Sequence, residues 1–129
     1  MVKRRLRILV VEDEDAIRQA IRDSLIERGY HVEAASGGRE GLEALQKKPS
    51  FDLAILDINL PGLSGAQLLR YIEQESPKTE VIIISGYANQ ETKIDAVSHG
   101  AFTVLQKPFS FKDLLDVVDR LLQPPRGAS

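Results

Sequence analysis

The hydrophobic periodicity of this chain changes repeatedly between two types, and this feature limits its fold more than any other. Short continuous apolar runs, typical of strands that are buried on both faces, alternate with apolar stripes at helical spacing. Five such pairs follow one another along 129 residues. The expected strands are Leu6–Val11, His31–Ala35, Phe51–Asp57, Val81–Ile84 and Phe102–Leu105.

The apolar stripes predict five helices with recognisable ends. Gly29 ends the first stripe, and Pro124 and Pro125 end the last. The expected helices are Ile17–Leu25, Gly38–Lys47 (followed by Pro49), Ala66–Gln74, Gln90–Ser98 and Leu114–Leu122. Strands that alternate with helices of about ten residues imply a parallel sheet with helices on both faces. The predicted fold class is therefore α/β, a single doubly wound five-stranded parallel sheet with five helices.

The length and composition favour one domain and exclude several kinds of site. A chain of 129 residues is close to the size of one domain. It contains no cysteine, which excludes disulfides, Cys-based zinc sites and thiol nucleophiles. No apolar run approaches the roughly 20 residues of a membrane helix, and no signal peptide is recognisable, so we expect a cytoplasmic protein without a membrane partner. The net charge of −2 predicts no direct binding to nucleic acid.

Polar residues follow four of the five expected strands. They are Glu12–Glu14 after the first strand, Asp57 after the third, Ser85 after the fourth and Lys107 after the fifth. In an open parallel sheet, functional residues gather at the carboxyl ends of the strands. Each residue alone has an ordinary explanation: acids favour a helix N-terminus, and serine and lysine are common in loops. Asp57 is harder to explain in this way, because it ends a very apolar strand.

The chemistry of this set points to phosphate and to a hard cation. Carboxylate oxygens without a neighbouring histidine or cysteine suit Mg²⁺. A cation lets a carboxylate attack a phosphoryl group without prohibitive repulsion, and an aspartate is a known nucleophile in such reactions. A lysine and a hydroxyl can then bind the phosphoryl oxygens.

Four motifs at these strand ends give the chain a resemblance to the receiver domain of bacterial two-component response regulators. They are "ILVVEDED", "LAILDINLPGLSG", "VIIISGYA" and "GAFTVLQKPF", and the similarity runs from about Arg5 to Leu122. The resemblance implies the flavodoxin-like strand order 2-1-3-4-5. We expect a receiver domain over residues 1–123 and a tail, or the start of a linker, over 124–129.

The resemblance also implies roles for single residues. Asp57 matches the phosphoacceptor, Ser85 the switch hydroxyl, and Lys107 the lysine that binds the phosphoryl group. The bond between Lys107 and Pro108 matches a cis peptide of the family.

A magnesium site, which Mn²⁺ can also occupy, is implied at the same place. Its expected ligands are Asp13, Asp57, the backbone carbonyl of Asn59, and Glu12 as the second acid of the pair. Glu14 is expected to point toward solvent. Glu12 departs from the family, in which aspartate is commoner at this position, and the change lengthens the side chain by one methylene.

A second departure concerns the residue three positions before the lysine. The family often has an aromatic side chain there, but this chain has Val104. Phe102 is expected to share a face of its strand with Val104 by alternation. The usual movement of an aromatic ring coupled to Ser85 is therefore in doubt.

The implied function is a phosphorylation-operated signalling switch, not an enzyme acting on a separate substrate. Its phosphoryl donor is a sensor histidine kinase or a histidine phosphotransfer protein, and its signal leaves through the fourth helix, fifth strand and fifth helix. Dimerisation on phosphorylation stays open, as does the choice between a stand-alone regulator, part of a DNA-binding regulator and part of a hybrid kinase.

The side chains of Asn59 and Tyr87 are expected to cover the phosphoryl group and hinder in-line attack by water. Replacement of Tyr87 by alanine should therefore shorten the lifetime of the phosphoryl group.

Three other functions fit the pattern less well. An aspartate-nucleophile phosphatase typically has a second acid where this chain has Asn59, and it needs a cap for which no residues remain. A flavin-binding module needs a phosphate-binding loop after the first strand, where three consecutive acids would repel a phosphate. A receiver that no longer accepts phosphate would not be expected to keep Asp13, Asp57, Ser85 and Lys107 together.

Overall fold

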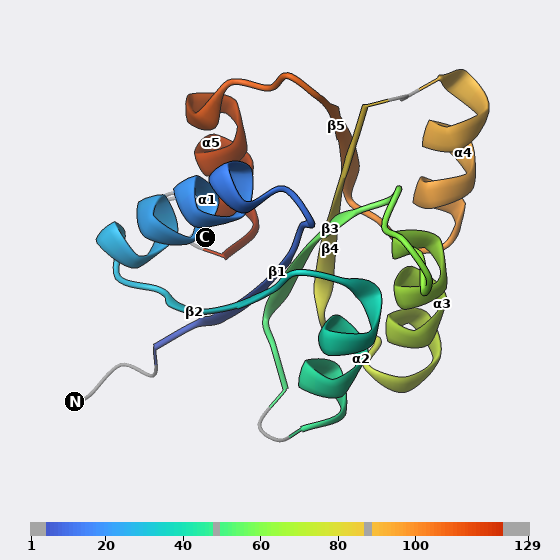
Figure 1. Cartoon of the computed structure of the whole chain (residues 1–129), viewed down its shortest axis with the longest axis horizontal. Coiled ribbons are helices and arrows are strands. Elements are labelled where there is room, and N and C mark those ends of the chain that lie inside the picture. The colour runs from blue at the N-terminus through green and yellow to red at the C-terminus, as the bar shows by residue number, and fades with distance from the viewer. Residues whose placement is uncertain (1–4, 48–49, 87–88, 123–129) are drawn as a thin grey trace, which may run out of the picture.

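A five-stranded parallel sheet forms the centre of the molecule and lies between two layers of helices (Figure 1). The structure is a computed structural model, and it describes residues 5–47, 50–86 and 89–122. The strand order is β2-β1-β3-β4-β5, as the resemblance implies. The strands are β1 (Arg7–Val11), β2 (His31–Ala35), β3 (Leu53–Asp57), β4 (Glu80–Ser85) and β5 (Thr103–Gln106).

Five helices connect the strands and cover both faces of the sheet, which confirms the predicted fold class. Helices α1 and α5 lie on one face, and α2, α3 and α4 lie on the other (Figure 1). The helices are α1 (Asp15–Glu27), α2 (Gly38–Gln46), α3 (Gly65–Glu75), α4 (Gln90–Ser98) and α5 (Phe111–Leu122). No helix in the described part of the chain is long and apolar enough to cross a membrane.

The central strand β3 explains why the strands of this chain are continuous apolar runs in the sequence. All five of its residues are buried, because helices cover both faces of the strand. Leu53 and Ile55 pack in the layer of α1 and α5, whereas Ala54 and Leu56 pack in the layer of α2, α3 and α4. Burial of one such aliphatic side chain contributes about 1.5–3 kcal/mol, so the strand is firmly held in its register.

Helix α3 begins one residue earlier than its apolar stripe predicts, because its N-terminus has a complete capping box. The Ser64 hydroxyl accepts a hydrogen bond from the backbone N–H of Gln67 (3.2 Å), and the Gln67 side chain accepts one from the backbone N–H of Ser64 (2.9 Å). Gly65 then fits where a Cβ atom would lie 2.2 Å from the carbonyl oxygen of Asp57. Only glycine allows the start of α3 to pass this close to the end of β3.

The edge strand β5 starts after Phe102, one residue later than expected. The backbone N–H of Phe102 donates to Val81 O (2.7 Å), and its side chain is 45% exposed. Val104 lies inside the strand and packs against the layer of α2, α3 and α4. Val104 is thus partly buried against the core, while nearly half of the Phe102 side chain is exposed to solvent.

Candidate functional site

The strand register brings four chain segments to the carboxyl edge of the sheet. Asp57 ends β3 and pairs with Ile84 of β4, and Ser85 ends β4 and pairs with Gln106 of β5. Glu12 follows β1, the neighbour of β3 on its other side. Parallel strands with this register place the residues that follow them side by side. The edge predicted from the sequence therefore exists as one site.

Asp57 is held rigidly at the centre of this site, and it is only 3% exposed. Its Oδ1 atom accepts a hydrogen bond from the backbone N–H of Asn59 (2.9 Å). Its Oδ2 atom accepts one from Lys107 Nζ (2.9 Å). The following residue, Ile58, donates its N–H to Ile84 O at 3.0 Å and continues the pairing with β4. The carboxylate is therefore oriented before any ligand arrives.

Lys107 neutralises several acids at once. Its backbone N–H donates to Ser85 O (2.8 Å), and its peptide bond to Pro108 is cis, as the resemblance implies. Its Nζ atom lies 2.8 Å from Glu12 Oε1, 2.9 Å from Asp57 Oδ2 and 3.2 Å from Glu14 Oε1. The contact with Glu12 is an ion pair whose geometry falls short of an aligned hydrogen bond. The single positive charge of Lys107 is thus shared by the carboxylates of Glu12, Asp57 and Glu14.

The pKa values of Glu12 and Lys107 shift in ways that follow from this arrangement. Burial raises the pKa of Glu12, and the nearby Asp57 charge adds to the increase. The contacts with Lys107 and with the backbone N–H of Glu14 lower this pKa, but burial outweighs them. Burial alone would lower the pKa of Lys107, but the contacts with the carboxylates of Glu12 and Asp57 outweigh burial and raise the pKa above its usual value. Lys107 therefore stays charged at neutral pH.

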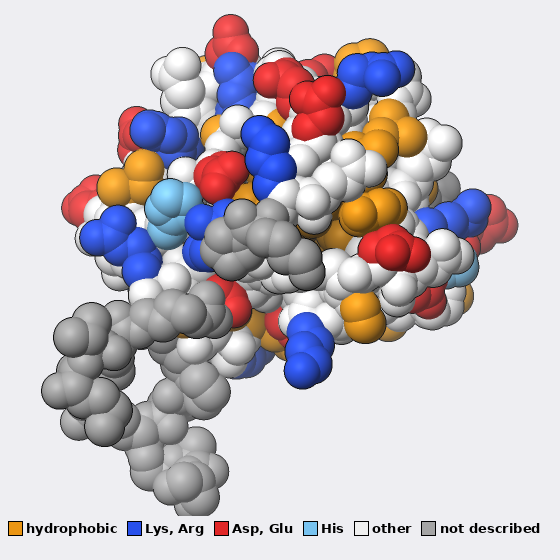
Figure 2. Space-filling view, turned by 90° about the horizontal axis from the view of Figure 1, so that it is seen from below, with side chains coloured by type: hydrophobic (Ala, Val, Ile, Leu, Met, Phe, Trp, Pro, Cys, Tyr) orange, Lys and Arg blue, Asp and Glu red, His pale blue; other side chains and the backbone are white. Residues whose placement is uncertain are grey.

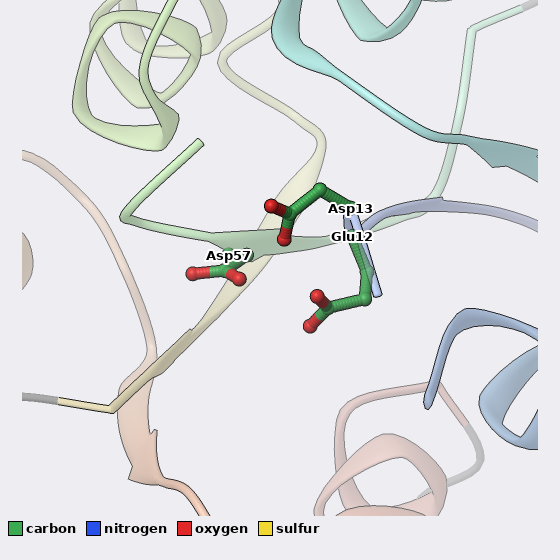
Figure 3. A group of neighbouring side chains, drawn as sticks. All are labelled: Glu12, Asp13 and Asp57. Carbon is green, nitrogen blue, oxygen red and sulfur yellow. The ribbon is translucent and has the colours of Figure 1, made fainter. Parts of the chain in front are cut away.

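Three acidic side chains converge in a group that fits a metal ion (Figure 3). Glu12, Asp13 and Asp57 each offer one oxygen, and these oxygens lie within 4.8 Å of one another. Glu12 Oε1 is buried and lacks an aligned hydrogen bond among the described residues. Oxygen ligands at this spacing match the preference of small hard cations such as Mg²⁺. The donor set therefore fits a divalent cation of this kind.

The loop that carries the acids is held by contacts that the sequence analysis did not predict. The Glu12 backbone N–H donates to Ala35 O of β2 (3.1 Å), and its carbonyl accepts from Arg18 Nη1 (3.0 Å). Arg18 also donates to Asp15 Oδ1 at 2.5 Å. The spacing of Asp15 and Arg18 on α1 could have indicated their ion pair, but not the bond to Glu12.

Most residues expected at the site do lie there. Glu12, Asp13 and Asp57 gather together, Lys107 contacts two of them, and Ser85 ends β4 beside them, fully buried.

Two expectations about neighbouring residues have different outcomes. Glu14 is 62% exposed, as expected, but its carboxylate contacts Lys107 instead of lying free in solvent. Tyr87, which was expected to cover the phosphoryl group, lies outside the described residues.

The fold and the site together define an α/β domain with a group of acidic side chains and a lysine at the carboxyl edge of its sheet. The response regulator receiver domain family matches residues 8–119. The chain belongs to this family. It is 33% identical over 122 residues to the cell cycle response regulator CtrA of Brucella ovis, an alignment that covers 95% of this chain and 52% of the relative. The chain thus spans about half the length of the curated relatives it matches.

Solved receiver structures have the same fold. A CheY-like receiver domain protein from Methanospirillum hungatei superposes with a TM-score of 0.84 at 34% identity, covering 92% of this chain and 94% of the other. The chemotaxis protein CheY4 of Vibrio cholerae superposes with a TM-score of 0.83 at 32% identity, covering 92% of this chain and 99% of the other.

Proposed function

We propose that this domain is a switch operated by phosphorylation of Asp57. The observation that carries the proposal is the placement of this buried carboxylate between Lys107, 2.9 Å away, and the oxygens of Glu12 and Asp13. A negatively charged nucleophile can approach a phosphoryl group only where positive charge offsets the repulsion. Lys107 supplies one positive charge, and the acidic group provides the ligands for another.

The proposed donor is a phosphorylated histidine of a sensor kinase or a phosphotransfer protein. An Asp57 oxygen attacks the phosphorus in line, a P–O bond forms, and the P–N bond to the histidine breaks. The imidazole leaves with the bonding electron pair and takes up a proton. Lys107 then donates to the phosphoryl oxygens, and Ser85 supplies the hydroxyl that approaches them. Slow hydrolysis returns the domain to its starting state, so it has no separate substrate.

We propose that Mg²⁺ is the metal, with Mn²⁺ as a substitute, and that Asp13, Asp57 and the backbone carbonyl of Asn59 bind it. Glu12 orients the site from its buried position. The bound cation would neutralise charge on the transferred group.

Replacing Asp13 by asparagine is expected to weaken Mg²⁺ binding by about tenfold, or about 1.4 kcal/mol, because one charged ligand is lost. Glu14→Gln is the matched control, because the Glu14 carboxylate lies outside the group of converging oxygens. Calorimetry or NMR titration measures both affinities. Equal losses in the two variants would contradict the assignment of Asp13 as a ligand.

We propose that the signal leaves through α4, β5 and α5, and that the start of α4 carries most of the change. Of the nine described residues of α4, only Ala96 is buried, whereas α3 buries Gly65, Leu68, Leu69 and Ile72. Helix α4 is therefore the more easily displaced of the two. Val104 is a compact, stiff side chain packed on the core, and it has no ring to move between two positions.

The experiment is an NMR comparison of the free protein with its complex with beryllofluoride, a phosphoryl mimic, in Mg²⁺. Outside the immediate surroundings of Asp57, we expect the largest chemical-shift changes in Ser85–Lys93 and smaller changes at Val104. The change in population should be modest, because a ligand shifts a two-state equilibrium only in proportion to the difference in its contact energy with the two states. An absence of any beryllofluoride complex would contradict the proposed function. Larger changes at Val104 and Phe102 than in Ser85–Lys93 would contradict the proposed route of the signal.

We also propose that the receiver unit comprises residues 1–123, that it works in the cytoplasm, and that it binds neither nucleic acid nor membrane directly. The net charge of −2 supports this view. On the face seen in Figure 2, acidic and basic side chains are interspersed, without one broad basic surface. Dimerisation on phosphorylation and the role of residues 124–129 as a tail or linker belong to the same proposal.

A further inference from the structure

Three carboxylates surround the ammonium group of Lys107, and two of them, Asp57 and Glu14, accept hydrogen bonds from it. It carries three N–H groups, and three carboxylate oxygens lie within 3.2 Å of its nitrogen, from Glu12, Asp57 and Glu14. A phosphoryl group on Asp57 brings further acceptor oxygens and negative charge to the same place. The phosphoryl oxygens therefore compete with these carboxylates for the ammonium group of Lys107.

The three acids differ greatly in their freedom to move. The Glu12 side chain is completely buried, and its Oε2 atom accepts the backbone N–H of Glu14 at 2.9 Å. Asp57 is the residue that carries the phosphoryl group. The Glu14 side chain is 62% exposed and sits at the N-cap of α1, next to solvent. Glu14 alone among these three can turn into water without moving a charge through the core.

We propose that Glu14 is a positioning residue that shares Lys107 in the resting state and must release it when the phosphoryl group binds. This inference rests on the proposed function and adds a regulatory step to it. The Glu14 contact stabilises the resting state relative to the phosphorylated one. Its carboxylate therefore lowers the affinity of the site for a phosphoryl group and limits phosphorylation by weak donors.

The experiment measures the affinity of the full chain for beryllofluoride in saturating Mg²⁺ by NMR titration. Glu14→Gln removes the charge of Glu14. Glu14→Asp keeps the charge but shortens the side chain by one methylene, which breaks the contact with Lys107. Asp23→Asn removes one charge from an exposed residue of α1, whose carboxylate pairs with Arg22 instead of Lys107. The urea midpoint of each variant shows whether its fold is retained.

We expect Glu14→Gln and Glu14→Asp to raise the affinity by about two- to fivefold, the range of an exposed ion pair. Asp23→Asn should bind like the wild type. The inference would be overturned if Glu14→Asp behaved like the wild type, or if Asp23→Asn bound as tightly as Glu14→Gln, because general charge would then explain the effect. Unchanged affinity in both Glu14 variants would also overturn it while leaving the proposed function intact. The proposed function itself fails if the wild type binds no beryllofluoride or if Asp57→Asn binds it equally well.

Discussion

Substitution of Asp57 by asparagine is expected to abolish phosphoryl uptake from acetyl phosphate in Mg²⁺. The amide has nearly the same shape, and its oxygen can still accept a hydrogen bond from Lys107 or from the backbone N–H of Asn59. It lacks the negative charge that makes the carboxylate a nucleophile. The variant should therefore keep the fold and lose the reaction.

Intact-mass spectrometry measures the fraction of each protein that carries one phosphoryl group. Asp23→Asn is a suitable control, because Asp23 is an exposed residue of α1 whose ion pair with Arg22 lies outside the site. It should take up phosphate like the wild type. Equal uptake by Asp57→Asn and the wild type would contradict the assignment of the phosphoacceptor.

Replacement of Lys107 by methionine should destabilise the metal-free protein by about 3 kcal/mol at pH 7, because it leaves buried carboxylates without their cation. Lys112→Met is the matched control. Its ammonium is 81% exposed and pairs with Asp116 on the surface of α5, so we expect a much smaller loss than for Lys107→Met. Urea unfolding in EDTA measures both values, and similar losses in the two variants would contradict the account of Lys107.

The cost of removing Lys107 should also depend on pH. The folded-state pKa of Glu12 is raised, so the stability contributed by its protonation is present below its unfolded pKa and is lost as pH rises through the folded pKa. Without Lys107, a contact that lowers the pKa of Glu12 disappears, so the folded-state pKa of Glu12 is higher still. The variant therefore goes on losing stability up to a higher pH than the wild type does. The deficit of Lys107→Met should therefore be larger at pH 7 than at pH 4. A deficit that is constant over this range would contradict the role of the carboxylates.

The fold and the centre of the site could be predicted because they follow from local patterns. Runs such as Leu53–Leu56 identify strands that are buried on both faces, and the ends of parallel strands meet at one edge. Asp57 and Lys107 could thus be placed together although 50 positions separate them. The order of the strands needed the family resemblance, because the alternation of strands and helices alone leaves it open.

The contacts of Glu14 and Arg18 could not be predicted in the same way. Glu14 resembles any acid at the start of a helix, and its contact with Lys107 depends on where the loop after β5 lies in space. The bond from Arg18 to the Glu12 carbonyl depends on the path of the loop before α1. The first contact joins residues far apart in the sequence and the second depends on the conformation of a loop, so neither can be recognised from the hydrophobic pattern.

Chemical trapping of the phosphorylated residue tests the central claim most directly. Borohydride reduces an acyl phosphate to an alcohol, so an aspartyl phosphate becomes homoserine while free carboxylates do not react. The wild type, phosphorylated with acetyl phosphate in Mg²⁺, reduced and digested, should contain homoserine at position 57 alone. Homoserine at position 13, the reduced side chain of a phosphorylated Glu12, or no reduced residue at all would contradict the proposal that Asp57 accepts the phosphoryl group.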